Sequence, residues 1–149
     1  MNRDFVEMLA ALSAAGAEFL IVGAYAMAAH GLPRATGDID IWVRPTRNNA
    51  ERVMHAVRTF GAPLFGLSVE DLLRSDTVFQ IGIAPNRIDI LTGITGVLFE
   101  EAWPNRLTLK IDDQVVPVIG RAELVRNKAA TGRPKDQADV IWLRERTRS

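Results

Sequence analysis

The sequence predicts an α+β domain with a mixed β-sheet and helices packed on it. The first half alternates between helical and strand patterns, the middle is mostly strands, and two helical segments close the chain. The 149 residues suit a single domain over residues 1–149, and the hydrophobic share of 48% is enough for a buried core. A TIM barrel is excluded by length alone.

The first half of the chain is predicted to alternate helices with strands. Phe5, Met8, Leu9 and Leu12 recur at helical spacing, and Gly16 follows them as a stop. The later segments each show an apolar face or an apolar run. They are a buried strand over Phe19–Val22, a helix over Ala24–His30 that ends at Gly31, a strand over Asp38–Val43, and a helix capped by Thr46.

The second half is expected to supply further strands and then two helices. Ser68 caps a short helix that runs through Leu73, because acidic residues follow it in the first turn. Pro117 predicts that its strand is an edge or irregular strand, since proline cannot donate to a ladder. The expected elements are strands over Thr77–Ile83 and Arg87–Leu91 with a turn at Ala84-Pro85-Asn86, strands over residues 107–111 and Val115–Ile119, and helices over Ala122–Thr131 and Pro134–Arg144.

The composition excludes several classes of protein. Eighteen Lys and Arg balance eighteen Asp and Glu, which argues against strong DNA binding through bulk positive charge. Without cysteine, disulfides, zinc–thiolate sites and thiol nucleophiles are excluded. The longest apolar stretch, Phe19–Ala29, is too short to span a bilayer, and the first residues lack an apolar signal core. We therefore expect a soluble cytoplasmic protein with no membrane partner.

Three acidic residues on predicted strands are the main candidates for chemistry. Asp38 and Asp40 alternate with Ile39 and Ile41, so both carboxylates face one side of the strand, with Cα atoms roughly 7 Å apart. Two carboxylates this close repel each other unless a cation, such as a hard divalent metal ion, lies between them. Asp89 lies on a later strand and becomes a third ligand if the two strands are neighbours. The alternative is a half-exposed strand with an acidic outer face.

A phosphate-binding segment is expected next to these acids. Gly23 opens the predicted helix after the first strand, and the free N–H groups of a helix N-terminus bind anions. Arg34 and Thr36, just before the acidic strand, are candidates for phosphate contacts. The alternatives are a glycine required for packing and a solvated polar loop.

These features together resemble the nucleotidyltransferase superfamily, which shares a polymerase-beta-like catalytic core. The signature is seen in Val22-Gly23-Ala24, in Asp38-Ile39-Asp40-Ile41, and in Asp89. The stretches IVGAYAMAAHGLPRATGDIDIWV and LVRNKAATGRPKDQADV look like the stand-alone bacterial branch, which includes toxin-type nucleotidyltransferases. Ala24 departs from the signature, which usually has Gly or Ser there, and leaves phosphate binding to the backbone.

The resemblance implies two-metal chemistry on a nucleoside triphosphate. Asp38 and Asp40 would hold Mg²⁺ against the triphosphate, and Asp89 would bind a second Mg²⁺ and help to activate the acceptor hydroxyl. Lys128 would reach the triphosphate from the next-to-last helix, with a surface lysine as the alternative. The positions expected to bind the nucleotide are Gly23, Ala24, Arg34, Thr36 and Lys128.

The remaining polar and aromatic residues are interpreted as structural. Asp136 and Asp139 are expected to cap and solvate the last helix, and His30 to cap carbonyls at a helix end. Trp42 is expected to pack in the core, with a base-stacking surface near the acids as its functional alternative.

The expected function is that of a metal-dependent nucleotidyltransferase. It would move a nucleoside monophosphate to an unknown acceptor, which is a small molecule, a protein side chain or an RNA end. The alternatives are a catalytically silent binding module with this fold and one component of a toxin–antitoxin-like two-gene system. The resemblance also implies a partner protein or homodimer that completes the acceptor site.

Overall fold

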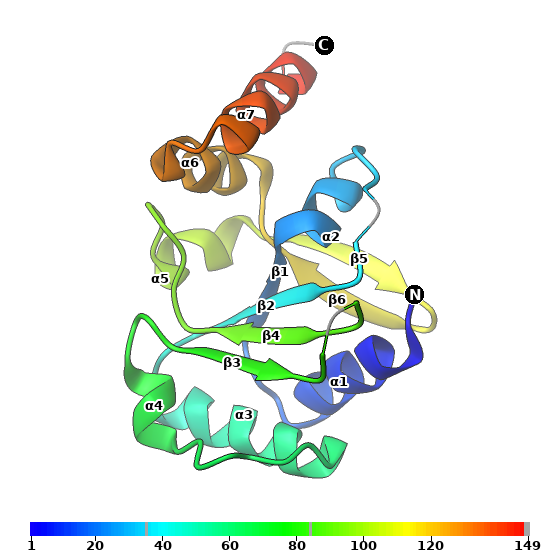
Figure 1. Ribbon diagram of the computed structural model, residues 1–149, viewed down its shortest axis with the longest axis vertical. Coiled ribbons are helices and arrows are strands. Elements are labelled where there is room, and N and C mark those ends of the chain that lie inside the picture. Colours follow the sequence, from blue (N-terminus) through cyan, green and yellow to red (C-terminus); the bar gives the residue numbers. More distant parts are fainter. Residues whose placement is uncertain (35, 84, 148–149) are drawn as a thin grey trace.

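A mixed β-sheet forms the centre of the protein (Figure 1). The computed structural model describes residues 1–34, 36–83 and 85–147. The strands of these residues are β1 (Phe19–Val22), β2 (Ile39–Val43), β3 (Val78–Ile81), β4 (Ile88–Leu91), β5 (Leu107–Ile111) and β6 (Gln114–Val118). They follow the spatial order β3-β4-β2-β1-β6-β5, with parallel and antiparallel pairs. The predicted α+β fold with a mixed sheet is confirmed.

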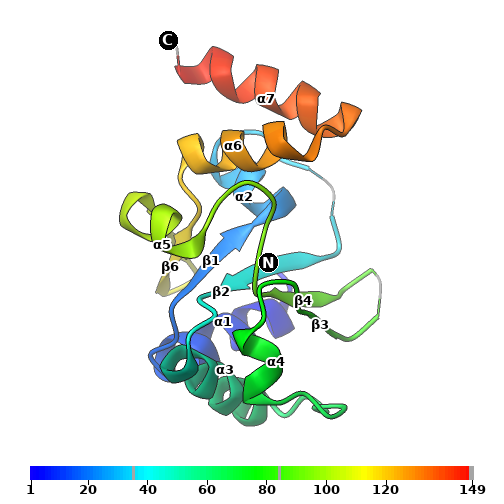
Figure 2. The same ribbon diagram turned by 90° about the vertical axis from the view of Figure 1, so that its left-hand side faces the viewer.

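Helices lie on both sides of this sheet (Figure 2). Their bounds are α1 (Arg3–Ala14), α2 (Gly23–Ala29), α3 (Arg47–Phe60), α4 (Val69–Leu73), α5 (Phe99–Ala102), the 3₁₀ helix η1 (Trp103–Asn105), α6 (Arg121–Thr131) and α7 (Pro134–Thr147). Figure 2 shows α1, α3 and α4 below the sheet and α2, α6 and α7 above it. None of the helices in the described residues is long and apolar enough to cross a membrane.

The core lies between the sheet and the layer formed by α1 and α3. The four apolar positions that predict α1, from Phe5 to Leu12, are all buried, as their helical spacing requires. All four side chains of β1 are also buried, because this strand lies inside the sheet with β2 on one side and β6 on the other. Ile39 and Ile41 of β2 are fully buried, so the alternate residues of this segment face the other side.

The strand register places the acidic residues together. Strand β2 lies between β1 and β4, and Asp40 is aligned with Val22 on one side and with Asp89 on the other. Directly aligned residues of neighbouring strands point to the same face of a sheet. Asp40 and Asp89 therefore lie side by side, and Asp38 just precedes β2 on the same face.

Two features of the second half differ from the sequence prediction. The short helices α5 and η1 were not predicted, because one helical turn is too short for a period, although Glu101 accepts a hydrogen bond from the Leu98 N–H at 2.9 Å. Pro117 lies in the interior strand β6, so of the two predicted alternatives, an edge strand or an irregular strand, the edge strand was wrong. The nitrogen of Pro117 faces β1, as does the Ile119 N–H that donates to Ile21, and the alignment of β6 with β1 is at Val118, just after the proline. Within the turn predicted at residues 84–86, Ala84 lies outside the described residues.

Candidate active site

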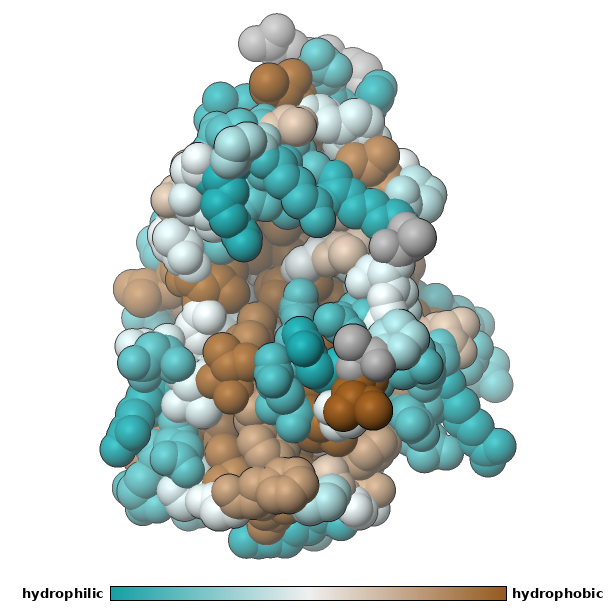
Figure 3. Space-filling view, viewed as in Figure 1, coloured by the Kyte–Doolittle hydropathy of each residue, from teal (hydrophilic) through white to brown (hydrophobic). Residues whose placement is uncertain are grey.

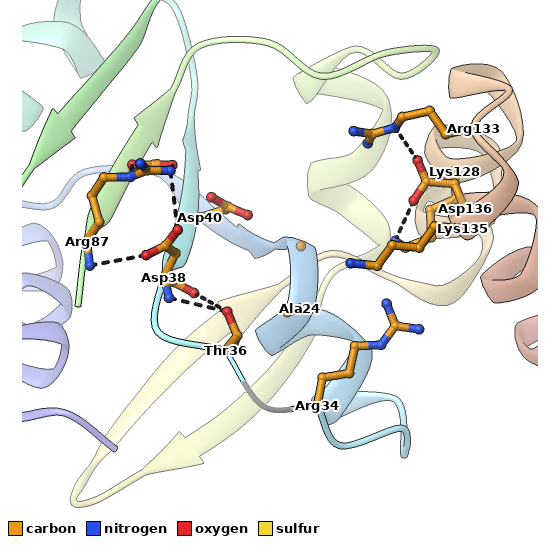
Figure 4. A pocket seen from close by; sticks show the side chains of 12 residues that line it. Ala24, Arg34, Thr36, Asp38, Asp40, Arg87, Lys128, Arg133, Lys135 and Asp136 are labelled. Carbon is orange, nitrogen blue, oxygen red and sulfur yellow. Dashed lines mark hydrogen bonds and ion pairs between the residues drawn. The ribbon is translucent and has the colours of Figure 1, made fainter. Parts of the chain in front are cut away.

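Three carboxylates line one open cavity of about 420 Å³ (Figure 4). Asp40 comes from β2, Asp89 from β4, and Asp38 from the residue before β2. Asp89 is buried, whereas Asp38 and Asp40 are half-buried. The structure thus brings the three acids of the sequence analysis onto one wall. In Figure 3 this face of the molecule is hollowed between the C-terminal helices and the sheet, with hydrophilic side chains on both sides.

Gly23 lets the chain pass directly beside the Asp40 carboxylate. Helix α2 begins at Gly23, as expected, and this residue has a φ of +70°. A Cβ atom at position 23 would lie 2.3 Å from Oδ2 of Asp40, closer than any van der Waals contact. The backbone conformation therefore favours glycine, and any side chain at this position would have to displace the Asp40 carboxylate. Ala24 follows and lines the same cavity (Figure 4).

An arginine that the sequence analysis did not select lies among the acids. The Nε and Nη2 atoms of Arg87 donate to the two carboxylate oxygens of Asp89 at 2.8 and 3.1 Å. Nη2 also lies 3.2 Å from Oδ2 of Asp38, whose Oδ1 accepts from the Arg87 backbone N–H at 3.3 Å. The signal was present, because Arg87 precedes Asp89 by two residues and so shares its face of the strand. We call Asp38, Asp40, Asp89 and Arg87 the acid cluster.

Asp40 is the unsatisfied member of the acid cluster. Its carboxylate forms no hydrogen bond or ion pair with any other residue in the described ranges. The pKa of Asp40 is raised to about 6, first by burial and then by the negative charges of Asp89 and Asp38, against the opposing charge of Arg87. The hydrogen bond to Asp89 holds the pKa of the Arg87 guanidinium above its usual value. The ionised form of Asp40 would therefore gain from a further cation.

The acid cluster fits a divalent cation in its chemistry. Mg²⁺ prefers oxygen ligands, and all three acids offer carboxylate oxygens. Among the residues that the structure describes, however, no three His, Cys, Asp or Glu side chains form a preassembled metal site. The Arg87 guanidinium, which lies between Asp38 and Asp89, supplies the positive charge at that position. The donor atoms suit the ion, but in this structure Asp38 and Asp89 are paired with Arg87.

The opposite wall of the cavity carries a second group of charges, which come from the two C-terminal helices, from the turn between them and from the segment between α2 and β2 (Figure 4). Lys128 of α6 is buried, and its Nζ atom lies 3.2 Å from Asp136 and 2.8 Å from Asp139 of α7. Arg34 forms a two-pronged ion pair with Asp139, and so ties the segment between α2 and β2 to α7. Arg133 donates to Asp136 at 2.8 Å. We call these five residues the helix cluster.

The carboxylates of the helix cluster are fully satisfied. Burial disfavours ionisation of Asp136, but hydrogen bonds from Thr131 and Lys128 outweigh it and hold its pKa below the usual value. The pKa of Asp139 is lowered in the same way by Arg34 and Lys128 against burial. Only 4% of Asp136 and 2% of Asp139 is exposed, so the expectation that they solvate the last helix was wrong. Their partners on other elements could not be identified from local spacing.

The cations that face the cavity most openly are not the ones that the sequence analysis selected. The side chain of Lys128 is 10% exposed and is held by two carboxylates, whereas 73% of the Arg133 side chain is exposed. Lys135 is exposed on the cavity wall and has no hydrogen bond or ion pair within the described part of the chain. Thr36 also lines the cavity, where its hydroxyl hydrogen-bonds the Asp38 backbone at 3.3 Å.

A smaller hollow of about 230 Å³ adjoins the cavity and shares Gly23, Asp40 and part of the helix cluster with it. The walls that the two do not share are uncharged: Val22, Leu91, Ile94, Thr95, Asn127 and Thr131. Asp40 therefore lies between a highly charged space and a space with aliphatic, hydroxyl and amide walls.

His30 and Trp42 are buried and support the fold. His30 is buried at the end of α2, and its Nε2 donates to the carbonyl oxygen of Ile119, 2.8 Å away. Trp42 is 1% exposed and packs edge-to-face on Phe99, which agrees with the predicted packing role. A base-stacking surface on Trp42 is excluded, because a base cannot reach a fully buried ring.

Comparison with solved structures identifies the fold. A candidate nucleotidyltransferase from Thermotoga maritima superposes with a TM-score of 0.62 at 16% identity, covering 96% of this chain and 92% of that one. A lincosamide antibiotic adenylyltransferase with lincomycin bound has a TM-score of 0.60 at 11% identity, covering 97% and 96%. An antigenic nucleotidyltransferase-like protein from Paracoccidioides brasiliensis has a TM-score of 0.52 at 17% identity, covering 94% and 74%.

At these identities the likeness concerns the fold, which extends over nearly the whole chain. No protein-family model and no curated protein matches this sequence. The resemblance found in the sequence and the three-dimensional comparison agree that this chain has the nucleotidyltransferase fold.

Proposed function

Because the chain has the nucleotidyltransferase fold, we propose that it transfers a nucleoside monophosphate from a nucleoside triphosphate to an acceptor hydroxyl, with Mg²⁺ as cofactor. One observation carries this proposal: Asp38, Asp40 and Asp89 line a single cavity whose opposite wall bears Arg34, Arg133 and Lys135. Carboxylates that can hold a metal ion thus face cations that can hold a polyphosphate.

The three carboxylates would have different roles in nucleotidyl transfer. Asp38 and Asp40 are the residues that would hold the cation at the α-phosphate, and Asp89 would join them on the acceptor side. When bound, Mg²⁺ would neutralise the charge that develops on the attacking and leaving oxygens. Two properties of Asp40 support this role: its carboxylate has no hydrogen bond or ion pair within the described residues, and its pKa is raised to about 6. A cation would therefore stabilise the charged form of Asp40.

The opposite wall would bind the polyphosphate. Arg133 and Lys135 are exposed and would contact phosphate oxygens directly. Lys128 would act through Asp136 and Asp139, which it holds in place, rather than as a free cation. Gly23 and Ala24 would offer backbone N–H groups, because helix α2 begins there and the Gly23 conformation brings it against Asp40.

The smaller hollow is where we place the nucleoside. Its unshared walls are aliphatic groups together with Thr95 and Asn127, a combination that suits an uncharged ring with polar edges. The Thr95→Trp variant would fill this hollow. We expect it to weaken binding of a nucleoside triphosphate about tenfold and to leave binding of inorganic tripolyphosphate unchanged. Thr108→Trp on the exposed strand β5 is the control, and equal losses for both probes would contradict the placement.

The transfer itself is tested with nucleoside triphosphates labelled at the α-phosphate. Each is incubated with the protein, Mg²⁺ and one acceptor: lincomycin, total RNA, or the proteins of a cell extract. Transfer of α-label but not of γ-label to an acceptor is the expected result. Asp40→Asn should abolish it, and Asp76→Asn on the exposed surface should not. Retention of transfer by Asp40→Asn would overturn the proposal.

A second candidate is a nucleotide-binding module that transfers nothing. The ion pairs of Arg87 with Asp38 and Asp89 favour it, because they occupy two of the three carboxylates. Ligand-induced stabilisation by nucleoside triphosphate and Mg²⁺, without transfer to any acceptor, would support this candidate.

A further inference from the structure

Arg87 is held by the same carboxylates that a metal ion would need. Its guanidinium lies 2.8 and 3.1 Å from the two oxygens of Asp89, and 3.2 Å from Oδ2 of Asp38. These contacts join residues of two neighbouring strands, because Arg87 and Asp89 flank one β4 residue and Asp38 directly precedes β2. A guanidinium with donors in a fixed fork is well suited to bridge two carboxylates in this way.

The bridge leaves an imbalance of charge. Three carboxylates face one guanidinium, and Asp40 is the carboxylate that Arg87 does not contact. A divalent cation and a guanidinium cannot share the oxygens of Asp38 and Asp89 without repelling each other. Metal binding therefore requires the guanidinium to move. The Arg87 side chain is 30% exposed on the cavity wall, so it can turn toward the cavity without unfolding the strand.

We propose that Arg87 is a positioning residue that makes metal binding depend on the nucleotide. Without ligand, the guanidinium holds Asp38 and Asp89 at a fixed spacing and excludes the cation from them. When a nucleoside triphosphate enters, its phosphate oxygens accept hydrogen bonds from the Arg87 guanidinium. Asp38 and Asp89 then lose their ion pairs with Arg87 and become free to hold the metal. This inference rests on the proposed function, since it assumes that the cavity receives both metal and polyphosphate.

Opposite effects on two ligands are the signature of this role. Removal of Arg87 should favour the metal alone, because a competing cation is lost, and should disfavour the polyphosphate, because a phosphate contact is lost. A residue that only supports the fold would weaken both ligands together. Coupling between two ligands typically changes affinity by roughly 5–150-fold, so effects of about tenfold are expected.

The test measures Mn²⁺ binding by electron paramagnetic resonance and tripolyphosphate binding by calorimetry, each without the other ligand. We expect Arg87→Gln to bind Mn²⁺ about tenfold more tightly than wild type, and tripolyphosphate about tenfold more weakly. Arg87→Lys, which keeps the charge but not the fork, should lie between the two. Arg47→Gln, which removes an arginine from an exposed 3.6 Å ion pair with Glu70, should leave both affinities unchanged.

Thermal melts guard against a variant that only loses stability. Without the guanidinium the three acids repel each other, so Arg87→Gln should melt below wild type in EDTA and should gain more from Mn²⁺ than wild type does. If wild type binds both ligands but Arg87→Gln and Arg87→Lys bind Mn²⁺ no better than wild type, the role of Arg87 is overturned while the proposed function stands. If neither wild type nor the variants bind Mn²⁺ or tripolyphosphate, both are overturned.

Discussion

The two walls of the cavity carry charges of the same kinds but use them differently. In the acid cluster three carboxylates face one guanidinium, and the pKa of Asp40 is raised to about 6. In the helix cluster two carboxylates face three cations, and the pKa values of Asp136 and Asp139 are lowered. One wall is thus short of positive charge, and the other has its carboxylates fully paired.

This difference separates a carboxylate that lacks a cation, Asp40, from carboxylates whose ion pairs hold the fold, Asp136 and Asp139. Buried charges that are paired and hydrogen-bonded are stable as they are, and removing one partner leaves the others unpaired. A carboxylate with a raised pKa is destabilised until a cation or proton reaches it. Substitutions in the helix cluster should therefore cost stability, whereas substitution of Asp40 should increase stability and remove ligand binding.

The largest expected effect is the loss of Asp139. Asp139→Ala leaves buried Lys128 with one carboxylate and Arg34 with none of its present partners, so we expect a loss of about 3 kcal/mol in the free energy of unfolding. Urea denaturation measures it. Glu7→Ala, which removes an exposed i,i+4 pair with Arg3, should change stability by less than about 0.5 kcal/mol. Equal, small effects of both substitutions would remove the distinction between the two walls.

The next effect concerns the contact between Gly23 and Asp40. Gly23→Ala should destabilise the protein by about 2 kcal/mol, through its positive φ and the collision of Cβ with Oδ2 of Asp40. Gly61→Ala has a φ of +93° but open space around it, so it should lose only about 1 kcal/mol. The double variant Gly23→Ala with Asp40→Ala relieves the collision. In a double-mutant cycle, Gly23→Ala should therefore destabilise the Asp40→Ala protein less than it destabilises wild type. Strict additivity would show that the close approach has no energetic effect.

A smaller effect of opposite sign is expected for Asp40 alone. Asp40→Asn removes a charge that is disfavoured first by burial and then by the charges of Asp89 and Asp38. Without metal it should therefore stabilise the protein by about 1 kcal/mol at pH 7, a value reduced for solvent screening. The variant should also lose stabilisation by Mg²⁺ with nucleoside triphosphate, which wild type should show in thermal melts. Destabilisation by Asp40→Asn would mean that its carboxylate accepts hydrogen bonds that matter to the fold.

The smallest effect is a difference in pH dependence between the walls. Because the pKa of folded Asp40 lies near 6 and that of the unfolded chain near 3.8, the folded state binds more protons between these values, and Asp40 lowers stability as pH rises from about 4 to 6. The stability difference between Asp40→Asn and wild type should therefore increase over this window and level off above it.

The helix cluster should show the reverse sign in a lower window. The folded pKa values of Asp136 and Asp139 are lowered, so the stability that they contribute is present above the ordinary carboxyl pKa and is lost as pH falls below it. Urea denaturation of wild type, Asp40→Asn and Asp139→Ala, repeated from about pH 3 to about pH 7, measures the free energy of unfolding across both pH windows. Identical pH profiles for the three proteins would contradict the assignment.

Much of the fold could be predicted because its signals are local. The spacing of Phe5, Met8, Leu9 and Leu12 predicts α1, and the alternation around Ile39 and Ile41 predicts β2, since periodicity reports which face is buried. The 3₁₀ helix η1 was missed because three residues cannot display a period. The edge strand predicted from Pro117 was wrong because the missing N–H matters only toward the neighbouring strand that the proline nitrogen faces. The strand pairing, and not the sequence, shows which neighbour that is.

The sequence by itself determined which side of its strand each acid occupies, because strand alternation is a property of neighbouring residues. It also placed Gly23 at the start of a helix beside a buried strand. Only the tertiary structure decided that β2 and β4 are neighbours, so that Asp40 and Asp89 lie side by side. Only the tertiary structure joined Arg34 to Asp139, which lie 105 positions apart. The physical reason is that Coulomb and hydrogen-bond energies depend on distance in space, and a one-dimensional pattern contains that distance only within a single helix or strand.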